Sequence, residues 1–102
     1  MNNIGLTEKE IAEVISYMAD NPKISRAIIF GSRAKGNYKP FSDVDLSLVG
    51  DNLNYSDLER IEEKLYYSYL PYIFDINIYS ELKNKALIDH IDRVGIEIYS
   101  GD

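Results

Sequence analysis

Two aspartates, Asp43 and Asp45, stand two positions apart in the run Ser42–Leu46. If this run is a β-strand, its period of two places both carboxylates on one face of the strand. Two ionised carboxylates so close together repel each other, and one is pushed towards protonation. A divalent cation removes this conflict, and Mg²⁺ is often held by one or two carboxylates with water and substrate phosphates. The spacing alone still favours a simpler interpretation, two solvated aspartates on an exposed strand.

A third aspartate, Asp75, lies in a later apolar segment between Phe74 and Ile76. Aspartate is disfavoured inside strands, and alternation turns it to the face opposite its apolar neighbours. If this strand lies beside the one that carries Asp43 and Asp45, three carboxylates meet on one patch, as a two-metal site requires. The alternative is a surface charge on an amphipathic strand, and the sequence leaves both open.

A small-residue turn, Gly31-Ser32, follows a short apolar run and is followed by the cations Arg33 and Lys35. Glycine lets the backbone approach a ligand closely. Free amides at the start of a helical turn attract anions, and we expect Ser32 to cap such a turn. These residues are typical of a phosphate-binding turn, although Gly-Ser alone is equally compatible with an ordinary strand-to-helix connection.

The first half of the chain must position these groups. A capping box at Thr7–Glu10 predicts a helix, which Asp20-Asn21-Pro22 ends because proline lacks an amide donor. The apolar residues of Ser25–Phe30 predict a strand covered on both faces. A loop at Asn37–Phe41 leads to an alternating strand at Asp43–Val49.

The second half predicts a helix from about Asp57 to Leu70, a strand at Tyr72–Tyr79, a helix from Ser80 to Gly95 and a short strand at Ile96–Tyr99. Alternation of this kind predicts an α/β (α+β) fold, with a mixed β-sheet of about four strands and helices packed against it. The short link between the first two strands allows them to be antiparallel neighbours. The sequence does not give the strand order.

The bulk composition narrows the class of protein. The chain has 102 residues, 45% of them apolar, no cysteine and a formal net charge of -6. We expect one domain, residues 1–102, with one core. The acidity argues against direct nucleic-acid binding but not against a nucleotide, which needs only a local positive pocket. Without a signal peptide or an apolar run of membrane-spanning length, we expect a cytoplasmic protein that does not contact a membrane.

Two further features have simple explanations. His90 is the single histidine, and on a helix it is expected to be a surface or boundary residue, not a ligand. Five tyrosines cluster in the second half: Tyr66, Tyr67, Tyr69, Tyr72 and Tyr79. We expect them mostly to pack on helix and strand faces, with an exposed partner surface as the alternative.

The combination of these motifs is more specific than any one of them. Gly31-Ser32, a ten-residue spacer, Asp43-x-Asp45 and a strand-borne Asp75 resemble the nucleotidyltransferase family of the DNA polymerase β type. Within that family the chain resembles the minimal nucleotidyltransferases (MNT), which are short stand-alone members. The resemblance covers nearly the whole chain and shows no departure at the carboxylates or at Gly31-Ser32.

This resemblance implies the polymerase β palm-like fold and roles for the three aspartates. Asp43 and Asp45 would bind two Mg²⁺ ions. Asp75 would bind the catalytic ion and help to deprotonate the attacking hydroxyl. Two metals stabilise charge on the entering and leaving oxygens of an in-line attack at phosphorus.

The resemblance also implies that ATP is the nucleotide donor. Gly31 and Ser32 would hold its triphosphate, and Arg33 and Lys35 would neutralise it. No residue is committed to reading the base, so the nucleobase is assigned by resemblance.

The acceptor must come from outside a chain this short. Minimal nucleotidyltransferases of this length resemble the antitoxins of HEPN/MNT toxin–antitoxin modules, in which the antitoxin transfers AMP to a toxin tyrosine. We therefore expect an antitoxin of a type VII-like module that forms a hetero-oligomer with a HEPN-family toxin. The alternatives are a nucleotidyltransferase acting on a small molecule such as an aminoglycoside, and a non-catalytic antitoxin that neutralises its partner by binding.

Overall fold

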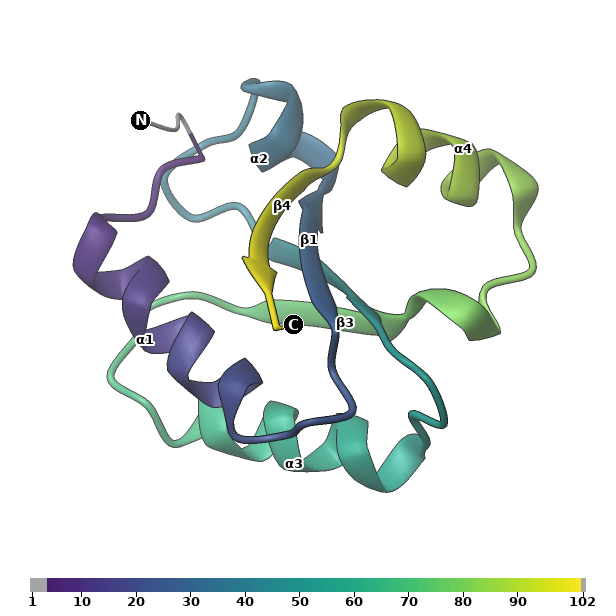
Figure 1. The fold of residues 1–102 in the computed structure, drawn as a ribbon. Helices are drawn as coiled ribbons and strands as arrows, with labels where there is room; N and C mark the ends of the chain where they lie inside the picture. Colours follow the sequence, from purple (N-terminus) through teal and green to yellow (C-terminus); the bar gives the residue numbers. More distant parts are fainter. Residues whose placement is uncertain (1–3, 102) are drawn as a thin grey trace.

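A four-stranded sheet forms the centre of the molecule, which is described for residues 4–101 by a computed structural model (Figure 1). The elements follow the predicted alternation of helices and strands, which confirms the α/β class. In chain order they are α1 (Glu8–Ala19), β1 (Arg26–Phe30), α2 (Gly31–Lys35), β2 (Val44–Val49), α3 (Tyr55–Tyr66), β3 (Phe74–Ile78), a 3-10 turn (Tyr79–Glu81), α4 (Lys85–Val94) and β4 (Ile96–Ser100).

The sheet is mixed, with the strand order β3-β2-β1-β4. β1 pairs antiparallel with β2 and with β4, whereas β2 and β3 are parallel. The antiparallel pairing of the first two strands is as predicted. The parallel pair needs a crossover, and α3 supplies it. β3 and β4 are the edges of the sheet.

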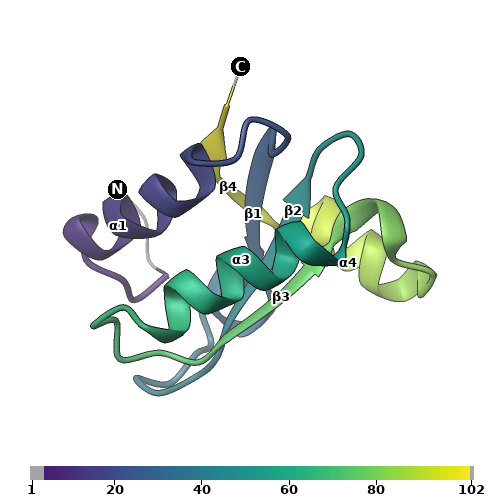
Figure 2. The same cartoon turned by 90° about the horizontal axis from the view of Figure 1, so that it is seen from below.

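One face of the sheet is covered by α1 and α3, which lie next to each other in Figure 2. Val44, Leu46 and Leu48 of β2 point into this layer and are fully buried. They pack with the apolar stripe of α1, including Val14 and Met18. The predicted alternation of β2 therefore has its apolar side in the main core.

On the opposite face α4 packs over β1, where Ile28 and Phe30 meet Ile91. Asp45 and Asp75 lie on this face, on the neighbouring strands β2 and β3. The apolar residues of α4 thus cover β1, and Asp45 and Asp75 lie on the same face of the sheet, next to this covered strand.

α3 begins within two residues of its predicted start and ends earlier than predicted. Asn54 caps it, since its side chain accepts the amide of Asp57 at 3.1 Å while the Asp57 carboxylate accepts the amide of Asn54 at 2.9 Å. The helix ends at Tyr66, where the Ser68 hydroxyl donates back to a carbonyl of the last turn at 2.6 Å. The predicted extension to Leu70 is wrong because this hydroxyl competes for helical carbonyls.

The last helix also begins later than predicted. Ser80 lies in the 3-10 turn, and α4 is capped by Asn84, whose side chain accepts the amides of Ala86 and Leu87 at 3.0 and 3.2 Å. Asparagine and serine are comparable N-caps, so propensity did not distinguish the two starts. Gly95 follows the helix directly, as predicted.

Three of the clustered tyrosines do not pack as predicted. Tyr66, Tyr67 and Tyr69 have exposed fractions of 80%, 75% and 102%. Tyr72 and Tyr79 are partly buried, and each donates a hydrogen bond to a carboxylate. α3 ends at Tyr66, so Tyr67 and Tyr69 lie beyond the helix, and Tyr66 lies on its exposed side.

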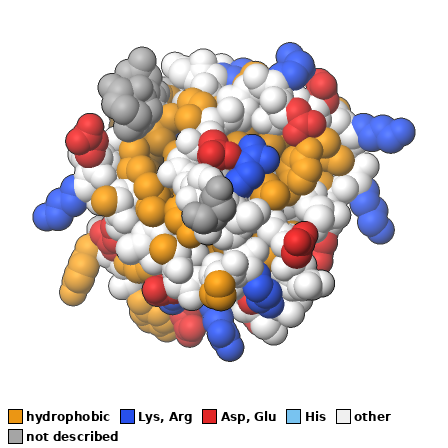
Figure 3. Space-filling view, in the orientation of Figure 1, with side chains coloured by type: hydrophobic (Ala, Val, Ile, Leu, Met, Phe, Trp, Pro, Cys, Tyr) orange, Lys and Arg blue, Asp and Glu red, His pale blue; other side chains and the backbone are white. Residues whose placement is uncertain are grey.

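The surface has mixed charge on the face seen in Figure 3, where Lys and Arg side chains are dispersed among acidic ones and form no continuous basic area. Among residues 4–101, no helix combines the length and the apolar character needed to cross a bilayer.

Candidate active site

The parallel pairing of β2 and β3 sets Asp45 directly opposite Asp75. Asp43 precedes β2 by one residue and shares the side of Asp45 by alternation. Asp45 is partly buried, whereas Asp43 and Asp75 are exposed. The neighbouring strands that the three-carboxylate hypothesis required are therefore present.

The electrostatic surroundings of Asp45 disfavour its negative charge. Burial of the Asp45 side chain, together with the negative charges of Asp75 and Asp43, raises the pKa of Asp45 above its ordinary value. Both effects disfavour the ionised carboxylate. A cation at this place would favour ionised Asp45 and relieve the repulsion.

The three aspartates do not form a complete metal cage of their own. Within residues 4–101, no three His, Cys, Asp or Glu side chains are grouped closely enough to hold a metal ion by themselves. Mg²⁺ does not require such a cage, because it is usually bound by one or two carboxylates with water and substrate phosphates. Asp45 and its exposed neighbours Asp43 and Asp75 offer only hard oxygen ligands, which fits an ion shared with a substrate.

Gly31 brings the backbone of the turn against Asp45. Its φ of +75° lies in the left-handed region, and a Cβ at this position would collide with Oδ2 of Asp45. Phe30, the preceding residue, is opposite Asp45 in the β1–β2 register. Glycine is thus required here both by backbone conformation and by the carboxylate that occupies the space of a side chain.

His90 has a partner that the sequence did not reveal. Its Nε2 accepts the amide hydrogen of Gly31 at 2.9 Å, and its ring lies edge-on to Phe30 with 6.1 Å between ring centroids. This contact uses the lone pair of Nε2 as the acceptor. The Gly31 amide is therefore not free, contrary to prediction. The two residues are 59 positions apart, so no local pattern could have linked them.

Arg33 does not reach the site as a free cation. It is 1% exposed, and its guanidinium donates to the carbonyl oxygens of Ile4 at 2.7 Å, Ser42 at 2.9 Å and Pro40 at 3.3 Å. The structure therefore gives Arg33 a structural role in place of the predicted contact with phosphate. Since Ser42 precedes Asp43, Arg33 fixes the backbone that presents this carboxylate.

Two aromatic rings complete the surroundings of Arg33. The rings of Tyr38 and Tyr72 each lie 5.0 Å from its central carbon, on the loop before β2 and the segment before β3. The Tyr72 hydroxyl donates to Glu10 of α1 at 2.8 Å. Cation–π contacts of a desolvated guanidinium are among the stronger ones, so Arg33 joins α2, the loop before β2 and the segment before β3.

The other residues of the turn lie in α2. Ser32 is its second residue and partly buried, so the predicted capping role of Ser32 is wrong, and no side chain caps this turn. Lys35 is exposed at the end of α2. Gly36, with φ of +86°, ends the helix and donates its amide to the Ser32 carbonyl at 2.9 Å.

A polar pair lies one step further along the acidic face. The Ser47 hydroxyl donates to Oδ1 of Asn77 at 2.6 Å across β2 and β3, and Ser47 is fully buried. This pair follows Asp45 and Asp75 by two residues on each strand and so lies on the same face. The alternation of each strand predicts that both residues lie on that face, but only the strand register shows that they are opposite each other.

Sequence comparisons point to one family. The family model described as "Polymerase beta, Nucleotidyltransferase" matches residues 12–102. A protein of Methanocaldococcus jannaschii, whose name proposes protein adenylyltransferase activity, is 32% identical over 93 residues, which cover 88% of this chain and 93% of that protein.

Solved structures with the same fold come from toxin–antitoxin complexes. A chain of a toxin–antitoxin complex with AMP-PNP gives a TM-score of 0.74 at 22% identity, covering 88% of this chain and 73% of that chain. A chain of the complex between MNT antitoxin and tri-AMPylated HEPN toxin of Shewanella oneidensis gives 0.68 at 18% identity, covering 88% and 69%. A chain of an MntA–HepT complex gives 0.70 at 19% identity, covering 92% and 73%. At these identities the likeness establishes the fold.

Proposed function

Because the chain belongs to the polymerase β nucleotidyltransferase family, we propose that it transfers AMP from ATP to a tyrosine hydroxyl of a HEPN-family toxin and thereby acts as its antitoxin. The observation that carries this proposal is the pairing of Asp45 with Asp75, beside Asp43 and against Gly31. It is the arrangement of acidic groups and backbone that Mg²⁺-dependent phosphoryl transfer needs.

In the proposed reaction the tyrosine oxygen attacks the α-phosphorus of ATP. A new O–P bond forms, the bond to the bridging oxygen of pyrophosphate breaks, and the tyrosine proton passes to Asp75. Asp43, Asp45 and Asp75 would hold two Mg²⁺ ions, which when bound supply positive charge to the entering and leaving oxygens. The exposed position of Asp75 suits a group that meets an incoming hydroxyl.

The triphosphate would lie along the start of α2. Ser32 donates its hydroxyl there, and Gly31 brings the backbone close to the carboxylates. Lys35 is the exposed cation of this helix and supplies positive charge. Arg33 contributes indirectly, by holding the Ser42 carbonyl in front of Asp43.

The choice of acceptor is supported by similarity. One similar structure contains an AMPylated HEPN toxin with its MNT antitoxin, another contains a toxin–antitoxin complex with AMP-PNP, and the M. jannaschii relative is named for protein adenylylation. These statements concern those proteins. These similarities make a HEPN toxin encoded by a neighbouring gene the first acceptor to test.

The test uses the purified protein, ATP labelled at the α-phosphate, Mg²⁺ and the product of the neighbouring gene. We expect the label on a partner tyrosine, identified by mass spectrometry, and none when Mg²⁺ is chelated. Asp45→Asn should reduce the transfer rate at least about 100-fold. Asp51→Asn, an exposed aspartate in the loop after β2, is the control and should leave the rate unchanged.

Two outcomes would overturn the proposal. A partner that is inhibited without gaining adenylate, by wild type and by Asp45→Asn alike, would identify a non-catalytic antitoxin. Adenylation of an aminoglycoside in place of the partner would identify an enzyme acting on small molecules.

A further inference from the structure

An apolar surface lies at the end of α3 and along the loop that leads to β3. We call it the tyrosine patch and define it as Tyr66, Tyr67, Tyr69 and Ile73, with exposed fractions of 80%, 75%, 102% and 71%. Two other large apolar side chains in the described chain are also strongly exposed, Phe41 at 90% and Tyr55 at 67%. Most of the strongly exposed apolar side chains thus gather in one segment, whereas scattered single residues need no explanation.

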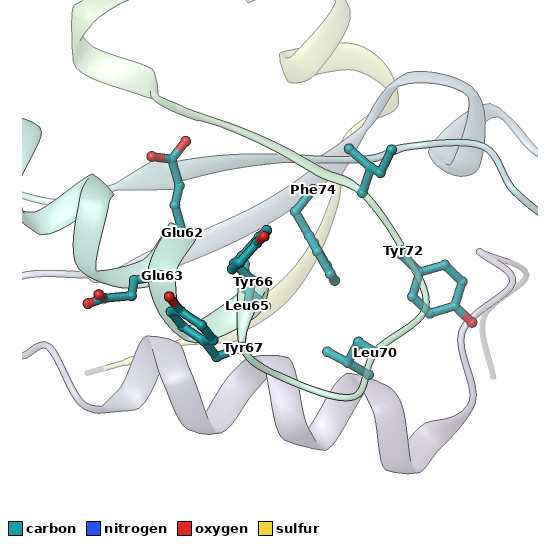
Figure 4. Close-up of a pocket in the computed structure, with 9 residues that line it drawn as sticks. Glu62, Glu63, Leu65, Tyr66, Tyr67, Leu70, Tyr72 and Phe74 are labelled. Carbon is teal, nitrogen blue, oxygen red and sulfur yellow. The ribbon is translucent and has the colours of Figure 1, made fainter.

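Beside the tyrosine patch is a pocket of about 760 Å³ (Figure 4). It lies between the end of α3, the following loop and the start of β3. Leu65 is its most buried lining residue, Leu70, Tyr72 and Phe74 are partly buried, and Glu62 and Glu63 carry its acidic groups. An apolar hollow flanked by exposed tyrosines is the form of a site that receives a partner's side chain.

The pocket and the acidic face are the two sides of one edge strand. Phe74 lines the pocket, and Asp75, the next residue, carries its carboxylate on the other face of β3. The Ile73 carbonyl accepts the amide of Val44 at 2.8 Å, which ties the pocket wall to β2 just before Asp45. Among residues 4–101 no strand pairs with the outer side of β3, so a partner bound at the pocket can extend around this edge to the carboxylates.

The charges around the pocket indicate which kind of protein can bind there. Glu62 and Glu63 are exposed, while Lys64 is held by Asp20 at 2.8 Å. Arg60 lies in a groove among three glutamates. A second copy of this chain, with its net charge of -6, would bring the same carboxylates to the interface and be repelled. A partner with Lys or Arg around an apolar side chain is complementary.

We propose that the tyrosine patch and its pocket are the docking surface for the acceptor protein, which inserts an apolar side chain into the pocket and surrounds it with basic residues. This inference rests on the proposed function, because it names the surface that brings the acceptor hydroxyl to Asp75. Tyrosines are frequent hot spots of binding energy and lose little conformational entropy when they are buried in an interface.

The test measures affinity for the neighbouring gene's product by biolayer interferometry, separately from AMP transfer. Tyr67→Ala and Tyr69→Ala should each weaken binding at least about tenfold. Tyr55→Ala, at the opposite end of α3 and 67% exposed, should change it less than about twofold. Circular dichroism and ATP affinity of each variant check that the fold and the nucleotide site are intact.

Charge reversal tests the partner's chemistry. The double variant Glu62→Lys/Glu63→Lys should weaken binding at least about tenfold at low salt and reduce its dependence on ionic strength. Asp51→Lys reverses a charge near the other end of α3 and should change the affinity for the partner less than about twofold.

The outcomes separate the two proposals. If the tyrosine variants bind the partner as wild type does, the docking surface is overturned even where AMP transfer proceeds. If they lose binding while wild type transfers no AMP, the docking surface stands and the proposed function fails. Self-association of wild type that Tyr67→Ala abolishes would identify a homodimer interface and overturn the inference, as would a partner that does not bind wild type.

Discussion

At the scale of single residues, the site depends on how closely Gly31 and Asp45 approach each other. Gly31 and Gly36 both have φ in the left-handed region, but only at Gly31 would a Cβ meet another group, the Asp45 carboxylate. At Gly36 a Cβ would have no atom within 4 Å. A substitution at Gly36 therefore tests backbone strain alone, whereas one at Gly31 tests strain together with collision against Asp45.

We expect Gly36→Ala to lower the free energy of unfolding by about 1 kcal/mol, the cost of left-handed backbone for a residue with a Cβ. Gly31→Ala adds a collision to the same strain and should cost about 3 kcal/mol or more and displace the Asp45 side chain. Urea denaturation gives both values, and the AMP-transfer rate should fall much further for Gly31→Ala. Equal losses for the two variants would contradict the contact.

Asp45 also carries a stability cost in the absence of a cation. Its pKa is raised in the folded state, so the folded state binds the proton more tightly than the unfolded state does. Stability from this group is therefore present at low pH and is lost as the pH rises through the raised pKa.

At neutral pH and with EDTA present, Asp45→Asn should raise the melting temperature, since the amide carries no charge. Mg²⁺ should raise the melting temperature of wild type more than that of the variant. Differential scanning fluorimetry measures both. Asp51→Asn is the matched control. If Asp45→Asn is no more stable than wild type in EDTA, the repulsion between the carboxylates is contradicted.

At the scale of elements, the start of α3 is held by a charged cap. The Asp57 carboxylate accepts the Asn54 amide and forms an ion pair with Lys23 at 2.6 Å, and Asn21 donates to it at 3.0 Å. Hydrogen bonding to Lys23, followed by the Asn54 backbone, lowers the pKa of Asp57 from 3.8 to about 2. The cap joins α3 to the turn between α1 and β1.

A lowered pKa stabilises the folded state above the unfolded value and stops doing so as the pH falls through the folded one. Wild type should therefore lose stability between about pH 4 and pH 2 through Asp57. Asp57→Asn should be less stable than wild type at pH 7 and should lose less on acidification. Urea midpoints at several pH values measure this, and Asp51→Asn should keep the wild-type dependence.

α2 contains two cations in different surroundings, since Arg33 is buried and Lys35 is exposed. Arg33→Lys keeps the charge but not the guanidinium fork that binds three carbonyls, so it should cost about 2 kcal/mol of stability and slow AMP transfer. Lys35→Ala should change stability by less than about 0.5 kcal/mol and raise the KM for ATP. Chemical denaturation and steady-state kinetics separate the two effects, and a Lys35→Ala enzyme with unchanged KM would remove Lys35 from the phosphate site.

Local patterns predicted most elements and failed where two local signals competed. The capping box at Thr7–Glu10 starts α1 as predicted, because both of its hydrogen bonds form within four residues. Ser68 and Asn84 moved two helix boundaries because serine and asparagine side chains compete with the backbone at several nearby positions.

At the scale of the whole molecule, alternation placed the three aspartates on one side of their strands, but only the strand order could bring them together. That order depends on pairing between distant segments, such as β1 with β4, which no local pattern encodes. The same limit applies to the bond between Gly31 and His90 and to the burial of Arg33. The family resemblance predicted that the three aspartates lie together, which periodicity alone could not.

The hydrogen bond from Arg33 to Ile4 ties the segment before α1 to the candidate active site. One guanidinium binds the carbonyl of Ile4, a fully buried residue, and the carbonyl of Ser42 beside Asp43. Proteolytic removal of the segment through Ile4 would take away one of these acceptors and loosen the other. Loss of the Ile4 carbonyl would then shift the backbone before Asp43 without changing any of the three aspartates.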